Sequence, residues 1–153
     1  MNIHTTINIS ANDRKVIAKT SAMLEIKKSA LISSLAQYAG RKIRACPDMG
    51  SSIRYQEKRP KDEWRRLHLS FRGDEYEYCI DLRKVFKLSV SCFIAHAIKH
   101  YLDDLIKLII KGTDNYRYRN YAMMSFNIEN VMCRAYYWGI PRVLLAPSHD
   151  RIE

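Results

Sequence analysis

Two short stretches of the chain alternate polar and apolar side chains, Thr5–Ser10 (TTINIS) and Arg66–Phe71 (RLHLSF). A period of two is typical of a half-buried strand, so Ile7, Ile9, Leu67, Leu69 and Phe71 are expected to face a core. The opposite face would carry His4, Thr6, Asn8, Arg66, His68 and Ser70. Such side chains can hydrogen-bond base edges in the major groove of DNA, which a two-stranded ribbon fits. Ordinary polar residues on a wet sheet face would give the same pattern.

Two tripeptides are placed where helices are expected to begin, Lys27-Lys28-Ser29 and Ser89-Val90-Ser91. Free backbone N–H groups at a helix N-terminus bind anions, so these six residues are predicted to contact DNA phosphate. Ser89 is a good N-cap, whereas Lys27 is not. Lysines there oppose the helix dipole, a penalty that a phosphate would relieve. A surface lysine pair that binds nothing is the alternative.

Other chemistries have weaker support in the sequence. His96 and His100 have the i, i+4 spacing of metal ligands, and Asp103 and Asp104 follow one turn later, but no third fixed ligand is evident. A tyrosine nucleophile would need an accompanying cluster of His, Arg and Lys, which the chain does not supply. We therefore expect no catalytic residue, no metal site, no cofactor and no enzymatic activity.

A single strand exposes unpaired backbone groups on both edges, so each alternating stretch needs a partner. After TTINIS, a helix is predicted from Ala11 to Leu24, followed by a turn and a second helix that contains Leu31, Ile32, Leu35 and Tyr38. Shifted by 62 positions, this apolar pattern falls on the second half without a gap: Ile7 on Leu69, Ile9 on Phe71, and Leu31 on Phe93. The pattern predicts an internal repeat of strand, helix, turn and helix.

Composition and charge narrow the classes of partner. The net charge is +10, which attracts nucleic acid or anionic lipid. Residues 41–66 hold nine Lys or Arg against four Asp or Glu, although a solvated basic linker would look the same. The polar N-terminus resembles no signal peptide, and Lys107 interrupts the most apolar run, so no membrane association is expected. Scattered cysteines, at positions 46, 79, 92 and 133, favour reduced thiols in a cytoplasmic protein.

The repeat unit resembles the ribbon-helix-helix family of Arc- and MetJ-type DNA-binding proteins. In the second half of the chain the resemblance rests on RLHLSF and KLSVSCFIAHAIKHYL. In the first half it rests on TTINIS and EIKKSALISSLAQYA. Family members are usually dimers of one unit, whereas this chain looks like two units in tandem, as in TraY-type accessory proteins of conjugative plasmids. The family usually has glycine in the turn between its helices, where this chain has Glu25 and Lys87.

The expected fold is mainly α with a short two-stranded antiparallel ribbon. It is a tandem ribbon-helix-helix pseudo-dimer with a C-terminal helical extension. The predicted segments are a first unit at 1–44, a basic linker at 45–64, a second unit at 65–111 and the extension at 112–153. The helix of the extension is predicted from the helical spacing of Ile128, Val131, Met132, Ala135 and Tyr136. Interleaved tyrosines and arginines at 116–121 could stack on bases.

We therefore expect a sequence-specific double-stranded DNA-binding protein that inserts a β-ribbon in the major groove. The resemblance implies a transcriptional repressor or an accessory factor at a plasmid or mobile-element site. One alternative is an antitoxin-like module that also binds a protein partner. Another is a binder of single strands or RNA through the Tyr/Arg segment. The extension could support self-association, and further nucleic-acid contacts are predicted at Arg54, Lys58, Arg117 and Arg119.

Overall fold

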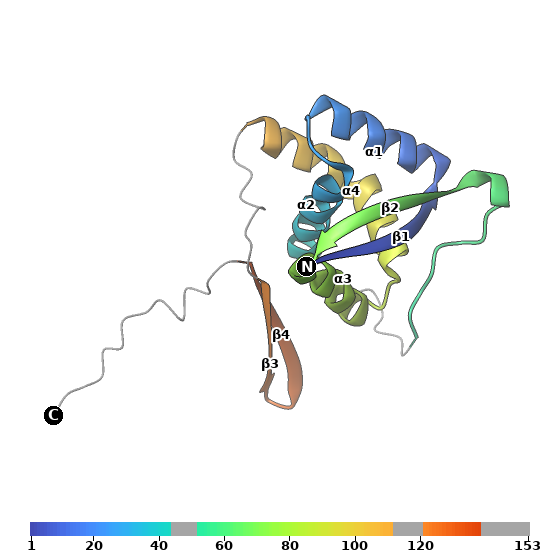
Figure 1. Cartoon of the computed structure of the whole chain (residues 1–153). Coiled ribbons are helices and arrows are strands. Elements are labelled where there is room, and N and C mark those ends of the chain that lie inside the picture. Colours follow the sequence, from blue (N-terminus) through green and yellow to red (C-terminus); the bar gives the residue numbers. More distant parts are fainter. Residues whose placement is uncertain (44–51, 112–120, 139–153) are drawn as a thin grey trace. The chain divides into compact units, whose positions relative to one another are not determined.

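The computed structural model describes residues 1–43, 52–111 and 121–138. The chain divides into two compact units, residues 1–116 and 117–153. The first contains strand β1 (Asn2–Ser10), helices α1 (Ala11–Met23) and α2 (Lys28–Lys42), a short 3-10 turn η1 (Lys61–Glu63), strand β2 (Trp64–Arg72), and helices α3 (Gly73–Phe86) and α4 (Val90–Ile110) (Figure 1). The predicted mainly α fold with a two-stranded antiparallel ribbon is confirmed for this unit, and the finer division into segments stays a prediction.

The two alternating stretches pair with each other. β1 and β2 are antiparallel, with Asn2 opposite Arg72 and Ser10 opposite Trp64. Both strands are longer than the sequence pattern indicated, since each contains nine residues. The five apolar residues expected to face inward are all buried, at 4% exposure or less. Their burial determines the register, because a shift of one residue would turn every apolar side chain to water.

Each strand leads directly into a helix, and the helix starts have local explanations. Ser10 caps α1, with its hydroxyl accepting a bond from the Asp13 amide at 3.0 Å. At the start of α3 the Arg72 amide donates to the Glu75 carboxylate at 2.8 Å. Ser89 caps α4 by accepting from the Cys92 amide. The short-range signals in the sequence therefore specify where these helices begin.

The turn between the helices of each pair has a left-handed residue. Glu25 has φ 53° and Lys87 has φ 52°. At these two positions the ribbon-helix-helix resemblance predicts the positive φ that usually favours glycine. A residue with a Cβ adopts it at a cost of about 1 kcal/mol or more, which the packing of the adjoining helices must offset.

The core lies between the ribbon and the second helix of each pair. α2 is buried over nine consecutive residues, 31–39, and packs against α4 and β2. α4 in turn packs against β1. Each of these helices therefore contacts the strand from the other half of the chain. The two halves share one core.

Gly40 is placed where α2 approaches α3, and its substitution should destabilise the fold. A Cβ at this position would collide with the hydroxyl of Tyr78, a residue only 2% exposed, and would lie 3.1 Å from a Leu82 methyl. Alanine usually stabilises a helix relative to glycine by about 0.5–1 kcal/mol. Here we expect Gly40→Ala to lower the free energy of unfolding by about 1–3 kcal/mol through overpacking.

Urea unfolding measures this difference, and Gly73→Ala is the matched control. Gly73 begins α3 and has open space where a Cβ would be placed. The control should be neutral or slightly stabilising. A stability gain in both variants would contradict the contact between α2 and α3.

The prediction of a helical C-terminal extension is wrong for residues 121–138. These residues form a hairpin of strands β3 (Tyr121–Ile128) and β4 (Val131–Trp138). Its two-residue turn, Glu129-Asn130, has φ values of 49° and 65°, as a type I′ hairpin turn requires. The apolar spacing suits a helix too, but aromatic and β-branched residues favour strands. Arg117 and Arg119 lie outside the described residues.

Candidate nucleic-acid interface

The six polar residues predicted to face outward lie opposite one another in three cross-strand pairs. His4 is opposite Ser70, Thr6 is opposite His68, and Asn8 is opposite Arg66. All are exposed except Ser70, which is half-buried. Thr6 Oγ1 and His68 Nδ1 are 2.9 Å apart, a hydrogen bond across the middle of the ribbon. The pairing gathers these side chains on one face.

This outward face extends beyond the predicted six residues. By alternation it also includes Asn2, Trp64 and Arg72, and it contains no carboxylate. Arg72 is bonded to Asp74 at 3.1 Å, and Arg59 lies over the Trp64 ring at 5.8 Å. The sequence interpretation missed these residues because it ended both strands too early. One further step of the alternation beyond His4, Arg66 and Ser70 leads to Asn2, Trp64 and Arg72.

Ser29 and Ser91, two of the residues predicted to contact phosphate, hydrogen-bond to the two edges of the ribbon. Ser29 Oγ accepts a bond from the Ser70 amide at 2.9 Å. Ser91 Oγ accepts one from the Asn8 amide at 3.3 Å. Each serine belongs to the half of the chain opposite to that of its strand. A free strand edge is a liability, and these bonds satisfy one amide on each edge.

The starts of α2 and α4 differ in their capping. Lys27 is the N-cap of α2 but makes no side-chain capping bond, and the first turn of α2 has no acidic residue. Lys27 and Lys28 are exposed. At α4 the Ser89 hydroxyl caps the helix, and Val90 is half-buried. The two lysines therefore supply positive charge at one edge of the ribbon.

The described part of the basic linker, which begins at residue 52, reaches the start of α4. The Arg54 amide donates to the Lys87 carbonyl, and the Ser89 amide donates to the Arg54 carbonyl, both at 2.8 Å. Gln56 Nε2 donates to the Asn8 carbonyl at 2.9 Å. Lys58 is exposed. These bonds place the predicted contact residue Arg54 and its neighbours beside β1.

The remaining candidate chemistry is sparse in the described part of the chain. The rings of His96 and His100 are 4.4 Å apart, and burial, helped by His100 and Lys99, lowers the pKa of His96. Residues 1–43, 52–111 and 121–138 contain no group of three or more His, Cys, Asp or Glu that could hold a metal. Nor does any helix within these ranges have the length and apolarity to cross a bilayer.

Cys46 lies outside the described residues, and the other three cysteines, at positions 79, 92 and 133, are free thiols. Burial raises the pKa of Cys79 to about 12, so its thiol is protonated at neutral pH. It therefore packs as a small apolar side chain.

Comparison of the chain with protein-family models, with curated proteins and with solved structures finds no match. The function must therefore be argued from the geometry of the ribbon and its surroundings.

Proposed function

We propose that the chain is a sequence-specific double-stranded DNA-binding protein that acts by binding alone. The observation that carries the proposal is the ribbon: three cross-strand pairs of polar residues on one face, and five buried apolar residues on the other. A two-stranded ribbon fits the major groove. Arginine, asparagine, serine, threonine and histidine can all hydrogen-bond base edges there.

We further propose that the fold is a tandem ribbon-helix-helix arrangement. The bounds of β2 lie 62 positions after those of β1, and α4 begins 62 positions after α2. Glu25 and Lys87, the left-handed turn residues, have the same separation. So do Ser29 and Ser91, which bond to equivalent positions of the two strands. Thr6 pairs with His68, its own equivalent, which puts a pseudo-twofold axis at the centre of the ribbon.

The surroundings of the ribbon suit a DNA duplex. The net charge of +10 favours any polyanion. Lys27, Lys28 and Ser29 flank one edge of the ribbon, and Ser89, Val90 and Ser91 flank the other, where they would meet the phosphate backbones. Contacts of this kind position a protein, whereas the outward face would read the sequence. The role would be that of a repressor or of an accessory factor at a plasmid or mobile-element site.

Selection from random duplexes, followed by sequencing, tests the proposal. The two halves of the outward face differ, with His4, Thr6 and Asn8 on β1 and Arg66, His68 and Ser70 on β2. We therefore expect one enriched asymmetric motif, because operator symmetry mirrors protein symmetry. Pools without enrichment, or binding to single strands in preference to duplex at equal salt, would contradict the proposal.

The C-terminal hairpin supports a second candidate function, binding of a protein partner. Met124, Phe126 and Ile128 are 53%, 43% and 54% exposed, and they alternate along β3 on one side of the hairpin. Val131 lies opposite Ile128 and is 62% exposed. Two-stranded hairpins are marginally stable by themselves in water, and burial of these apolar side chains against a partner would stabilise this one. Co-purification of a neighbour-encoded protein, lost in Phe126→Ser, would support this function.

A further inference from the structure

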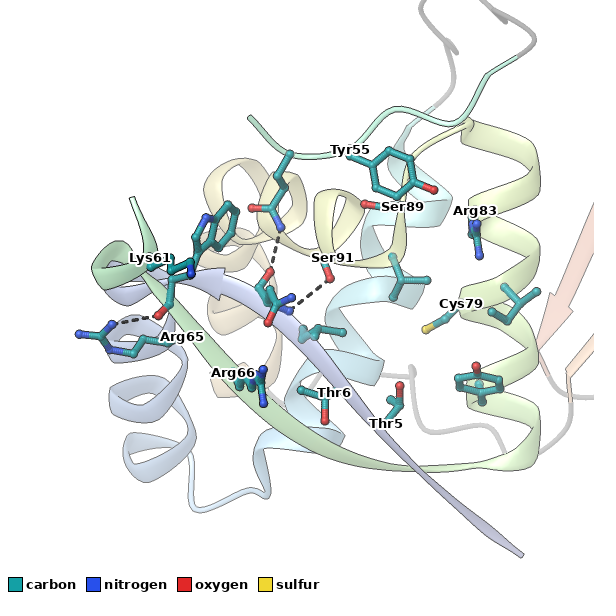
Figure 2. Close-up of a pocket in the computed structure, with 17 residues that line it drawn as sticks. Thr5, Thr6, Tyr55, Lys61, Arg65, Arg66, Cys79, Arg83, Ser89 and Ser91 are labelled. Atoms are coloured by element: carbon teal, nitrogen blue, oxygen red, sulfur yellow. Dashed lines mark hydrogen bonds between the residues drawn. The ribbon is translucent and has the colours of Figure 1, made fainter. Parts of the chain in front are cut away.

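The described part of the linker forms one wall of an open groove of about 860 Å³ along one edge of the ribbon (Figure 2). The linker segment between residues 54 and 63, here called the strap, is held by the backbone pairing of Arg54 with Lys87 and Ser89. Gln56 ties it to the edge of β1. The other walls come from the two ribbon strands, from α3 and from the start of α4. The groove borders the outward face, since Thr6, Asn8 and Arg66 line both.

The charged residues that line this groove are all cationic. Four cationic side chains contribute to the lining, Lys61, Arg65, Arg66 and Arg83, and no Asp or Glu is among the described residues that line it. The strap also contains three acidic residues, at positions 57, 62 and 63, but none of them lines the groove. Such a lining suits a polyanion.

Arg83 adds a second observation. Its Nε is buried and has no hydrogen-bond partner in the part of the chain that the structure describes. A buried unpaired donor is costly, and an acceptor oxygen entering the groove would relieve that cost. Guanidinium groups also match the oxygens of a phosphate better than ammonium groups do.

The opposite edge of the ribbon is different. The groove there is about 410 Å³ and is lined by His4, Thr5, Thr6, Ser29, His68, Leu69 and Ser70, with no lysine or arginine. Among the described residues, no segment equivalent to the strap lies along that edge. The surroundings of the ribbon therefore do not follow its pseudo-twofold symmetry.

We infer that the strap groove binds the phosphodiester backbone of DNA on one side of the site only. This inference rests on the proposed function. With the ribbon in the major groove, one backbone passes along the strap and meets Lys61, Arg65 and Arg83. The other backbone meets Lys27 and Lys28 at the opposite edge. The protein thus binds its site in one orientation, and the strap supplies extra phosphate contacts in that orientation.

Ethylation interference on the selected duplex tests the inference, because it neutralises single phosphates one at a time. We expect more interfering phosphates on one side of the site than on the other. The double change Lys61→Ala, Arg65→Ala should remove only the extra ones, and should lower the slope of log affinity against log salt by about two. Lys27→Ala, Lys28→Ala should instead remove interference on the other side.

Controls separate this inference from the proposed function. Lys19→Ala, Lys99→Ala removes two exposed charges outside both grooves and should leave the interference pattern unchanged. Lys61→Ala alone alters one exposed side chain, so a folding defect in the double variant would not hide the result.

Duplex binding with a two-sided symmetric pattern would overturn the strap contact and keep the proposed function. Saturable binding of a free mononucleotide, with the same symmetric pattern, would assign the groove to a small ligand and also overturn it. Failure of every duplex to bind would remove the proposed function itself.

Discussion

Cleavage of the chain after Met49 is expected to leave neither half folded alone. β1 would lose β2, its partner in the described sheet, and α2 would lose its contacts with α4 and β2. Ile7 and Ile9 would become exposed in one half, and Leu67, Leu69 and Phe71 in the other. Burial of such a side chain contributes about 1.5–3 kcal/mol. Loss of five of them is comparable with the whole stability of a small domain, about 5–15 kcal/mol.

Circular dichroism and light scattering on the separate and mixed halves check this result. Each half alone should be unfolded, aggregated or self-paired, and mixing should restore a folded complex, because the same apolar surface is buried without the linker. Cleavage after Tyr116, between the two compact units, is the control and should leave residues 1–116 folded. Two halves that fold separately without strand pairing would refute the shared core and, with it, the proposed function of the ribbon.

Replacement of Arg66 by alanine is expected to weaken binding to the selected site by about 1–3 kcal/mol and to relax base preference at one or two positions. Arg66 is exposed on the outward face, opposite Asn8. His68→Ala should act in the same way and also break the bond to Thr6. Binding to random duplex should change less, because phosphate contacts dominate there.

Competition binding with selected and random duplexes measures the affinity for each kind of duplex. Arg65→Ala is the neighbouring control: Arg65 is opposite Ile9, so it belongs to the other side of the strand, and it lines the strap groove. Its loss should weaken both duplexes alike. If Arg66→Ala also weakened them equally, the outward face would contact only phosphate and would not read the sequence.

The ribbon was predictable because its signal is local. Alternation in TTINIS and RLHLSF shows which side chains are buried, and Ser10 and Ser89 show where helices begin. The repeat indicated that each strand had a partner of its own type. The sequence pattern predicts a helix where the hairpin lies, because residues 128, 131, 132 and 135 satisfy a helical period as well. Its turn, Glu129-Asn130, lacks the glycine that usually indicates a type I′ hairpin.

Periodicity and capping act between neighbours in the chain, so the residue pattern alone predicts the inward and outward faces of the ribbon and the mainly helical character of residues 1–111. Contacts between residues far apart in the chain were found only in the folded structure. It placed Ser29 on the Ser70 amide and Ser91 on the Asn8 amide. It also placed Tyr78 against Gly40, and the strap beside one edge of the ribbon. Such contacts depend on how several elements pack at once, so no local pattern of residues encodes them.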